Sequence, residues 1–197
     1  MSHIYTEVDR LLLNRWGHVM ALLQAHRDIQ PRIEQVIEAT SSRLKPWAAA
    51  HGYEVSGTPR EARFDLWLPT WADRKRGPKV RLTIGGFCPS GFRKVDEEHP
   101  YLWVHTDLEN FKVKEPERVA FASRVRARLG MTAQEWVHHN TDDSWAPFGR
   151  YLESYDDAAR AELVSSPDAL YAFCTEQLPA LLALGEPIGH ELELLGR

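Results

Sequence analysis

The first fifty residues carry apolar side chains at intervals of three and four, which is the spacing of an amphipathic helix. We expect the first apolar stripe to be buried. Its members are Ile4, Val8, Leu11, Leu12, Trp16, Val19, Met20 and Leu23. The pattern pauses at residues 26–30, and Pro31 suits the first turn of a second helix, which Gly52 then ends. Residues 1–56 therefore predict an antiparallel helical hairpin.

The period changes to two after Gly57. Apolar and polar residues alternate over 62–68 and again over 80–84, which predicts two strands. The segment between them, 73–78, reads Asp-Arg-Lys-Arg-Gly-Pro and is typical of a turn. We expect these strands to form a hairpin with a basic tip. With a further strand at 101–106, residues 57–110 predict an antiparallel sheet of three to four strands.

Helical spacing returns in residues 111–197. Residues 119–129 predict one helix, and Thr132 to Glu135 form a capping-box pattern that would open a second, short one. A further short helix is expected at 157–163. Ser166 and Pro167 then suit the N-cap and first position of a final helix. Pro179 and Pro187 are expected to kink or divide that helix.

Consecutive strands between helical ends favour the α+β class, with the C-terminal helices packed on the sheet. We interpret residues 1–197 as a single domain, made of the helical hairpin 1–56, the antiparallel sheet 57–110 and the helical region 111–197. A chain of 197 residues with 43% apolar content can bury a core of its own. We therefore expect no cofactor and no structural metal.

The N-terminus does not resemble a signal peptide, and the apolar runs are short compared with the roughly 20 residues of a membrane helix. We expect no contact with a membrane. The only cysteines, Cys88 and Cys174, lie among apolar residues, which is typical of buried reduced thiols. These features predict a cytoplasmic protein.

Charge is distributed unevenly along a chain whose net charge is −4. Residues 57–94 hold nine lysines and arginines against three acids, a local charge of +6, whereas residues 131–197 hold twelve acids and three arginines. Cations with interleaved aromatics can bind phosphates and stack on bases. We expect a binding surface here. Its members are Trp67, Trp71, Arg74, Lys75, Arg76, Lys79, Arg81, Phe92, Arg93 and Lys94.

Other interpretations of this surface compete with nucleic-acid binding. The sequence pI of about 6.1 is low for a dedicated nucleic-acid binder. Basic residues on an edge strand also serve to block aggregation. The acidic C-terminal region could cover the basic hairpin, within one chain or between two. A protein partner or a second copy of the chain therefore fits this surface as well.

Patterns that indicate catalysis are few. Asp65 with Asp73 and Lys75 formally resembles the carboxylate and lysine pattern of metal-dependent nucleases, in which two acids hold a divalent cation. The Asp73 triplet falls in a predicted turn, however, where a nuclease would use a rigid strand. The chain has no Gly-x-Ser-x-Gly, phosphate-binding glycine loop or zinc-binding spacing. We assign no catalytic and no metal-binding residue.

The interpretation that follows is a non-enzymatic binding or accessory protein that acts through protein–protein contacts, as a homodimer or with another protein. The alternatives are nucleic-acid binding through the basic hairpin 57–94 and, less favoured, a divalent-metal-dependent nuclease. An exposed apolar patch near Trp67, Trp71 or Phe92 would favour the first interpretation. Convergence of Asp65, Asp73 and Lys75 in a cleft would favour the last.

Overall fold

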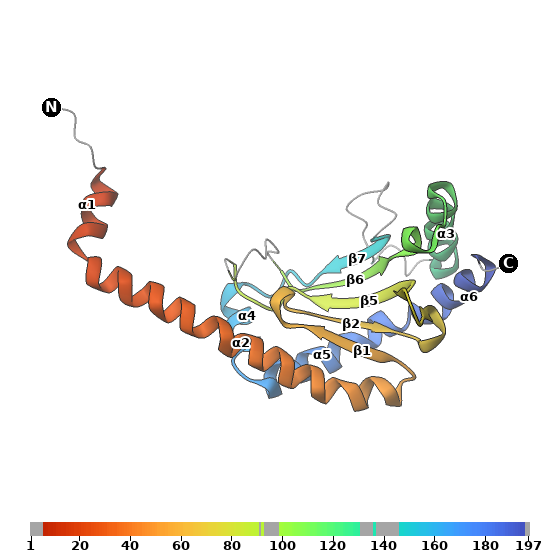
Figure 1. Cartoon of the computed structure of the whole chain (residues 1–197), viewed down its shortest axis with the longest axis horizontal. Helices are drawn as coiled ribbons and strands as arrows, with labels where there is room; N and C mark the ends of the chain where they lie inside the picture. Colours follow the sequence, from red (N-terminus) through yellow and green to blue (C-terminus); the bar gives the residue numbers. More distant parts are fainter. Residues whose placement is uncertain (1–5, 91, 93–98, 131–135, 137–145, 196–197) are drawn as a thin grey trace.

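A computed structural model describes residues 6–90, 92, 99–130, 136 and 146–195. It confirms the α+β class: a five-stranded antiparallel sheet is packed with helices from both ends of the chain, and a long N-terminal helix extends from the body (Figure 1). The helices α2 and α5 lie along one side of the sheet.

The sheet has the strand order β1-β2-β5-β6-β7, and every neighbouring pair is antiparallel. The strand bounds are Glu54–Thr58 (β1), Arg63–Trp67 (β2), Val80–Gly85 (β5), Tyr101–Thr106 (β6) and Phe148–Tyr151 (β7). The predicted strands β2, β5 and β6 are confirmed, and so is the pairing of β2 with β5. The predicted number of three to four strands is wrong because the edge strands β1 and β7 are short and show little alternation.

One face of the sheet is apolar and forms the core with the helices. Phe64, Leu82 and Val104 come from three neighbouring strands and have no exposed surface. Because side chains alternate along a strand, they share a face. Ile37 of α2 and Phe173 of α5 (Pro167–Leu182) belong to the same buried cluster. This burial fixes the body of the molecule.

The N-terminal region is not a helical hairpin. The helix α1 (Glu7–Asn14) is followed, after a kink at Arg15, by the helix α2 (Trp16–Ala50), which runs through Pro31 without a break. A proline inside a helix leaves the carbonyl four residues earlier without its hydrogen bond. Here that carbonyl belongs to Arg27, and both residues are exposed, so water can replace the lost bond.

The end of α2 follows the sequence prediction at Gly52. This glycine has a positive φ of 82°, which residues with a side chain rarely adopt. Its N–H donates to the Ala49 carbonyl at 3.0 Å, and the Tyr53 N–H donates to the Ala48 carbonyl at 2.9 Å. This is a Schellman motif, which turns the chain into β1.

The C-terminal helices mostly lie where the sequence predicts them. Their bounds are Glu115–Leu129 (α3), Asp157–Leu163 (α4), Pro167–Leu182 (α5) and Gly185–Leu195 (α6). Ser166 caps α5 by accepting a hydrogen bond from the Ala169 N–H. The division falls after Leu182 rather than at Pro179, which α5 accommodates. The helix predicted to open at 132–135 lies outside the described residues.

Candidate functional site

The basic tip is an exposed turn between two short strands, β3 (Ala72–Asp73) and β4 (Gly77–Pro78). The Asp73 carboxylate accepts hydrogen bonds from the backbone N–H groups of Lys75 at 2.9 Å and Arg76 at 3.1 Å. These bonds, that of Lys75 most, hold the pKa of Asp73 below its ordinary value, with the Arg76 and Lys79 charges adding to the effect. The only acid of the tip therefore shapes the turn, and three cations, Arg74, Lys75 and Arg76, face solvent.

Two further predicted cations, Lys79 and Arg81, are engaged within the molecule, and the exposed Arg76 of the tip also lies beside an aromatic ring. The Arg76 guanidinium and the Lys79 ammonium lie 5.7 and 5.6 Å from the centre of the Phe111 ring. Arg81 pairs with Asp107 at 2.8 Å and with Asp65 at 3.5 Å. Arg93 and Lys94 lie outside the described residues. The exposed cationic surface is therefore narrower than the sequence suggests.

The predicted aromatic residues do not flank the tip as stacking platforms. Trp71 is 3% exposed and Phe92 is 5% exposed, and both belong to the core. Trp67 is half-buried, and its indole N–H donates to Glu54 at 2.9 Å. No exposed apolar patch is therefore formed by these three residues.

The carboxylates of the nuclease hypothesis do not converge. Asp65 is buried on β2, where the Thr83 hydroxyl donates to it at 2.6 Å and Arg63 Nε lies 3.3 Å away. Asp73 lies in the separate β3-β4 sheet and its carboxylate is occupied by the turn. Within the described ranges, no group of three or more His, Cys, Asp and Glu side chains is placed to hold a metal ion.

His105 is a buried titratable residue close to the ion pair of Asp65 and Arg81. It lies on β6, directly opposite Arg81 in the register of the sheet. Burial lowers the pKa of His105 to about 4; the Asp65 charge opposes this effect, and the charges of Arg81 and Arg63 add to it. The imidazole is therefore neutral at neutral pH, which suits a structural position inside the sheet.

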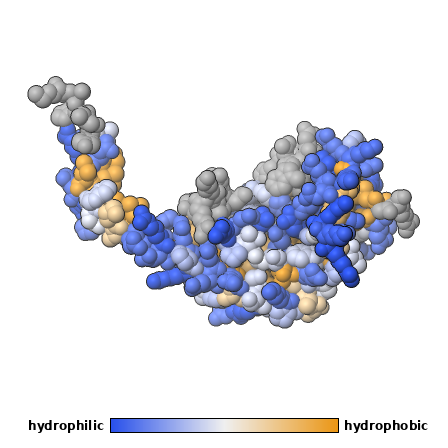
Figure 2. All heavy atoms as spheres, in the orientation of Figure 1, coloured by the Kyte–Doolittle hydropathy of each residue, from blue (hydrophilic) through white to orange (hydrophobic). Residues whose placement is uncertain are grey.

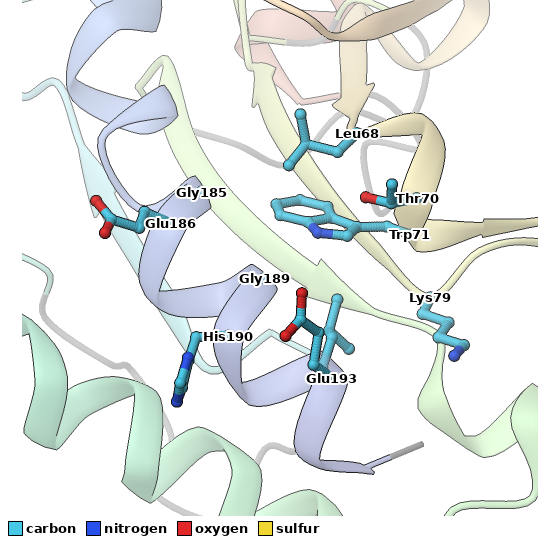
Figure 3. A pocket seen from close by; sticks show the side chains of 10 residues that line it. Leu68, Thr70, Trp71, Lys79, Gly185, Glu186, Gly189, His190 and Glu193 are labelled. Atoms are coloured by element: carbon cyan, nitrogen blue, oxygen red, sulfur yellow. The ribbon is translucent and has the colours of Figure 1, made fainter. Parts of the chain in front are cut away.

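A cleft of about 510 Å³ separates α6 from the chain around Trp71 (Figure 3). The Trp71 indole faces α6 across it. The lining residues are Leu68, Thr70, Trp71, Lys79, Gly185, Glu186, Gly189, His190, Leu192 and Glu193. Sequence reasoning missed this cleft, whose signal is the four-residue spacing of two glycines on α6. The lining mixes one lysine with two glutamates and does not select one class of ligand.

Most of the large exposed apolar residues in the described part of the chain lie elsewhere, on α1 and the first half of α2. We call residues 7–30 the helical arm. Figure 1 shows the arm projecting from the body, and Figure 2 shows apolar residues gathered on it. The expected burial of the N-terminal stripe is therefore wrong for its described members, and Ile4 lies outside the described residues. The large exposed apolar residues of the arm are Val8, Leu11, Leu12, Leu13, Trp16, Met20, Leu22, Leu23 and Ile29.

None of the described helices is both long and apolar enough to cross a membrane. Comparisons with models of protein families, with curated proteins and with solved structures find no match for this chain.

Proposed function

We propose that this chain is a non-enzymatic binding protein that acts through protein–protein contacts made by the helical arm. The observation that carries the proposal is the exposure of nine large apolar side chains on the arm, among them Leu22 at 72% and Val8 at 64%. Monomeric proteins rarely expose a contiguous apolar surface of this size. Fully burying one such side chain contributes at most about 1.5–3 kcal/mol, and the entropy lost on association opposes this gain.

The spacing of these residues indicates what the partner presents. Apolar positions separated by three and four residues, such as Trp16, Val19 and Leu23, form a stripe along one side of a helix. Such a stripe binds another apolar helix or a groove between helices. The proposed partner is therefore a protein surface of this kind. Cys88 and Cys174 are both buried free thiols, which supports a cytoplasmic location for the complex.

The test is site-specific photo-crosslinking in cells, with a photoreactive residue at Leu22 of the arm or, as the control, at Val119 of α3. Val119 is an exposed apolar residue of the body, at 42%. The protein joined at Leu22 is identified and purified, and its affinity is measured by calorimetry. We expect a Leu12→Gln, Leu23→Gln double variant to bind at least tenfold more weakly, and Val119→Gln to bind normally. Equal affinities, or no adduct specific to Leu22, would contradict the proposal.

A second candidate is nucleic-acid binding by the basic tip, favoured by the exposure of Arg74, Lys75 and Arg76. Because Trp71 and Phe92 are buried, such binding would rest on phosphate contacts alone. The slope of log affinity against log salt is about 0.9 per phosphate contact. Anisotropy with labelled DNA and RNA should then show a slope about 2–3 units shallower when the three cations become alanine. No binding at low salt would contradict this candidate.

A further inference from the structure

We infer that the cleft between α6 and Trp71 binds a small zwitterion, a free α-amino acid with an apolar side chain. This inference goes beyond the proposed function, because the cleft belongs to the body of the molecule and not to the helical arm. The sum of the lining charges does not select a ligand, but their placement around a buried hydrogen-bond donor does.

The indole of Trp71 is held firmly at one wall of the cleft. Trp71 is 3% exposed, and its ring meets the Tyr53 ring edge to face, with 6.3 Å between the ring centres. The indole lies along α6 over two glycines. A Cβ at Gly185 would lie 4.0 Å from its Cη2, and a Cβ at Gly189 would lie 3.5 Å from its Nε1. The glycines therefore leave room for a ligand beside the N–H edge of the indole (Figure 3).

The indole N–H of Trp71 has no acceptor among the residues that the structure describes. By contrast, the indole N–H of Trp67 donates to Glu54 at 2.9 Å. An indole N–H can only donate, and a buried donor that stays unpaired costs free energy. The acceptor for Trp71 therefore comes from whatever occupies the cleft, and a ligand that binds here should place an acceptor atom at this N–H.

A positive charge lies on the same side of the cleft as this donor. The backbone N–H of Lys79 donates to the Trp71 carbonyl at 2.9 Å, which fixes the lysine beside the tryptophan. The Lys79 ammonium lies 5.6 Å from the centre of the Phe111 ring and forms no ion pair within the described part of the chain. An indole N–H and an ammonium together favour an acceptor that carries negative charge, such as a carboxylate.

A negative charge faces this pair of donors from α6. Gly189 and Glu193 are four residues apart and line the cleft on one side of the helix. Glu191, on the opposite side, is buried and accepts a hydrogen bond from Arg124 Nε at 2.6 Å, which anchors α6 to α3. Figure 3 shows the Glu193 carboxylate turned toward the Trp71 side of the cleft. A carboxylate in this place favours an ammonium group on the ligand.

The rest of the lining indicates the size and the side chain of the ligand. The cleft volume of about 510 Å³ falls within the range of roughly 300–1,000 Å³ that is typical of small-molecule sites. Leu68 and Leu192 give it apolar walls. Glu186 and His190 turn away from Trp71 in Figure 3, so they lie at the outer edge. An apolar side chain of the ligand would pack against the two leucines.

A free α-amino acid combines these groups in one molecule. Its carboxylate would accept from the Trp71 N–H and face the Lys79 ammonium, and its own ammonium would face Glu193. Ligands that carry only one of the two charges leave either the donors or the carboxylate of the site without a partner, which weakens binding.

NMR of the ¹⁵N-labelled full chain tests this inference, because each of the seven tryptophans gives one indole signal. Sequential assignment, checked with Trp71→Phe, identifies the Trp71 signal. We expect added L-leucine to move that signal downfield and to saturate, as the N–H gains an acceptor. The Trp67 signal should stay in place, because its N–H is already bonded to Glu54. If no apolar L-amino acid moves the Trp71 signal, the inference is wrong.

Substitutions of the two charges test the placement of the ligand. Titration of the Trp71 signal should show that Lys79→Gln and Glu193→Gln each weaken L-leucine binding at least about tenfold. The matched controls are Lys45→Gln on α2 and Glu162→Gln on α4, both exposed residues outside the cleft, which should bind L-leucine normally. Equal affinities in all four variants would overturn the inference.

Two analogues of L-leucine test the need for both ligand charges. The acid 4-methylpentanoate lacks the ammonium group, and 3-methylbutylamine lacks the carboxylate. Each should bind at least about tenfold more weakly than L-leucine. An analogue that binds as tightly as L-leucine would show that the site recognises a single charge, and would overturn the zwitterion.

Gly189→Ala tests the site without removing a charge. The added Cβ would lie at an ordinary contact distance of 3.5 Å from Trp71 Nε1, so the chain should fold while the methyl group blocks access to the N–H. We expect L-leucine to lose its effect on the Trp71 signal. Circular dichroism and thermal unfolding check that the body is intact. Undiminished binding by this variant would contradict the assigned position of the ligand.

Discussion

The two halves of α2 both carry apolar residues at intervals of three and four, but only the second half is covered by other elements. Ile37 and Leu44 are buried against the sheet and α5, whereas Trp16 and Leu23 are exposed. Helical spacing of apolar residues recurs in both halves, so it does not explain the difference in burial. What differs is whether another apolar face lies within reach, since most helical stability in proteins comes from packing of the apolar face. Matched substitutions in the arm and in the body test this contrast.

The largest effect is expected from truncating an apolar residue in each half. Leu44 has no exposed surface, and Leu44→Ala should lower the free energy of unfolding by about 2–5 kcal/mol. Leu22→Ala, in the arm, should change it by less than about 0.5 kcal/mol in dilute protein. Urea unfolding followed by far-UV circular dichroism measures both. Equal losses would show that the arm is packed as the body is.

A buried histidine should make the body, and not the arm, sensitive to acid. The pKa of His105 is about 4 in the folded chain and about 6.5 when unfolded, so the unfolded state binds more protons between these values. Stability is therefore fully present above pH 6.5 and falls as the pH decreases to 4, by about 3 kcal/mol from this group. His105→Gln should flatten that part of the profile. The matched variant His18→Gln, in the arm, should leave it unchanged; identical profiles for all three chains would contradict the assignment.

Two helical glycines, one in the body and one in the arm, should respond in opposite ways to replacement by alanine. A Cβ at Gly185 would lie 2.0 Å from the Tyr53 hydroxyl, whereas a Cβ at Gly17 would meet nothing within 4 Å. Gly185→Ala should therefore destabilise the body by about 1–3 kcal/mol through overpacking. Gly17→Ala should instead stabilise the helix of the arm by about 0.5–1 kcal/mol and so raise its helix content. Thermal unfolding measures the loss of stability in Gly185→Ala, and helix content by circular dichroism measures the gain in Gly17→Ala. Changes of the same sign would contradict the difference in packing between the two helices.

The smallest effect is expected at two similar helix caps. The Thr6 hydroxyl accepts a hydrogen bond from the Asp9 N–H at 3.2 Å, and the Ser166 hydroxyl accepts one from the Ala169 N–H at the same distance. Replacing either by alanine removes about 1 kcal/mol of helix stability. Ser166→Ala should lower the global free energy of unfolding, whereas Thr6→Ala should only fray α1. Amide hydrogen exchange distinguishes a global loss from a local one; global loss in Thr6→Ala would contradict this expectation.

Local patterns predict much of this fold. The alternation at 62–68 and 80–84, the N-cap at Ser166 and the stop at Gly52 all act within a few residues, so the sequence alone indicates them. The strand β7 escapes prediction because its four residues are held by pairing with β6, which is distant in the chain. Pro31 misleads because α2 continues through it, at an exposed position where water can reach the carbonyl that loses its hydrogen bond.

The candidate sites are harder to predict for the same reason. Trp71 and Phe92 have the residue types of a binding surface, and their burial is decided by tertiary packing that no local pattern records. The Asp73 carboxylate is a hydrogen-bond acceptor within its own turn, a role indistinguishable in sequence from a ligand. The spacing of apolar residues in the arm is evident from the sequence. Their exposure is not, because it depends on whether another element of the described chain packs against them.

The unbroken course of α2 also has a mechanical consequence. A helix of 35 residues is a stiff rod of roughly 50 Å, anchored in the body from Ile33 onward and ended by the fixed turn at Gly52. It therefore acts as a lever. A force applied near Trp16 is transmitted along the helix to the buried contacts of Ile37 and Leu44. A protein bound to the arm would thus exert its load on the core beneath the sheet.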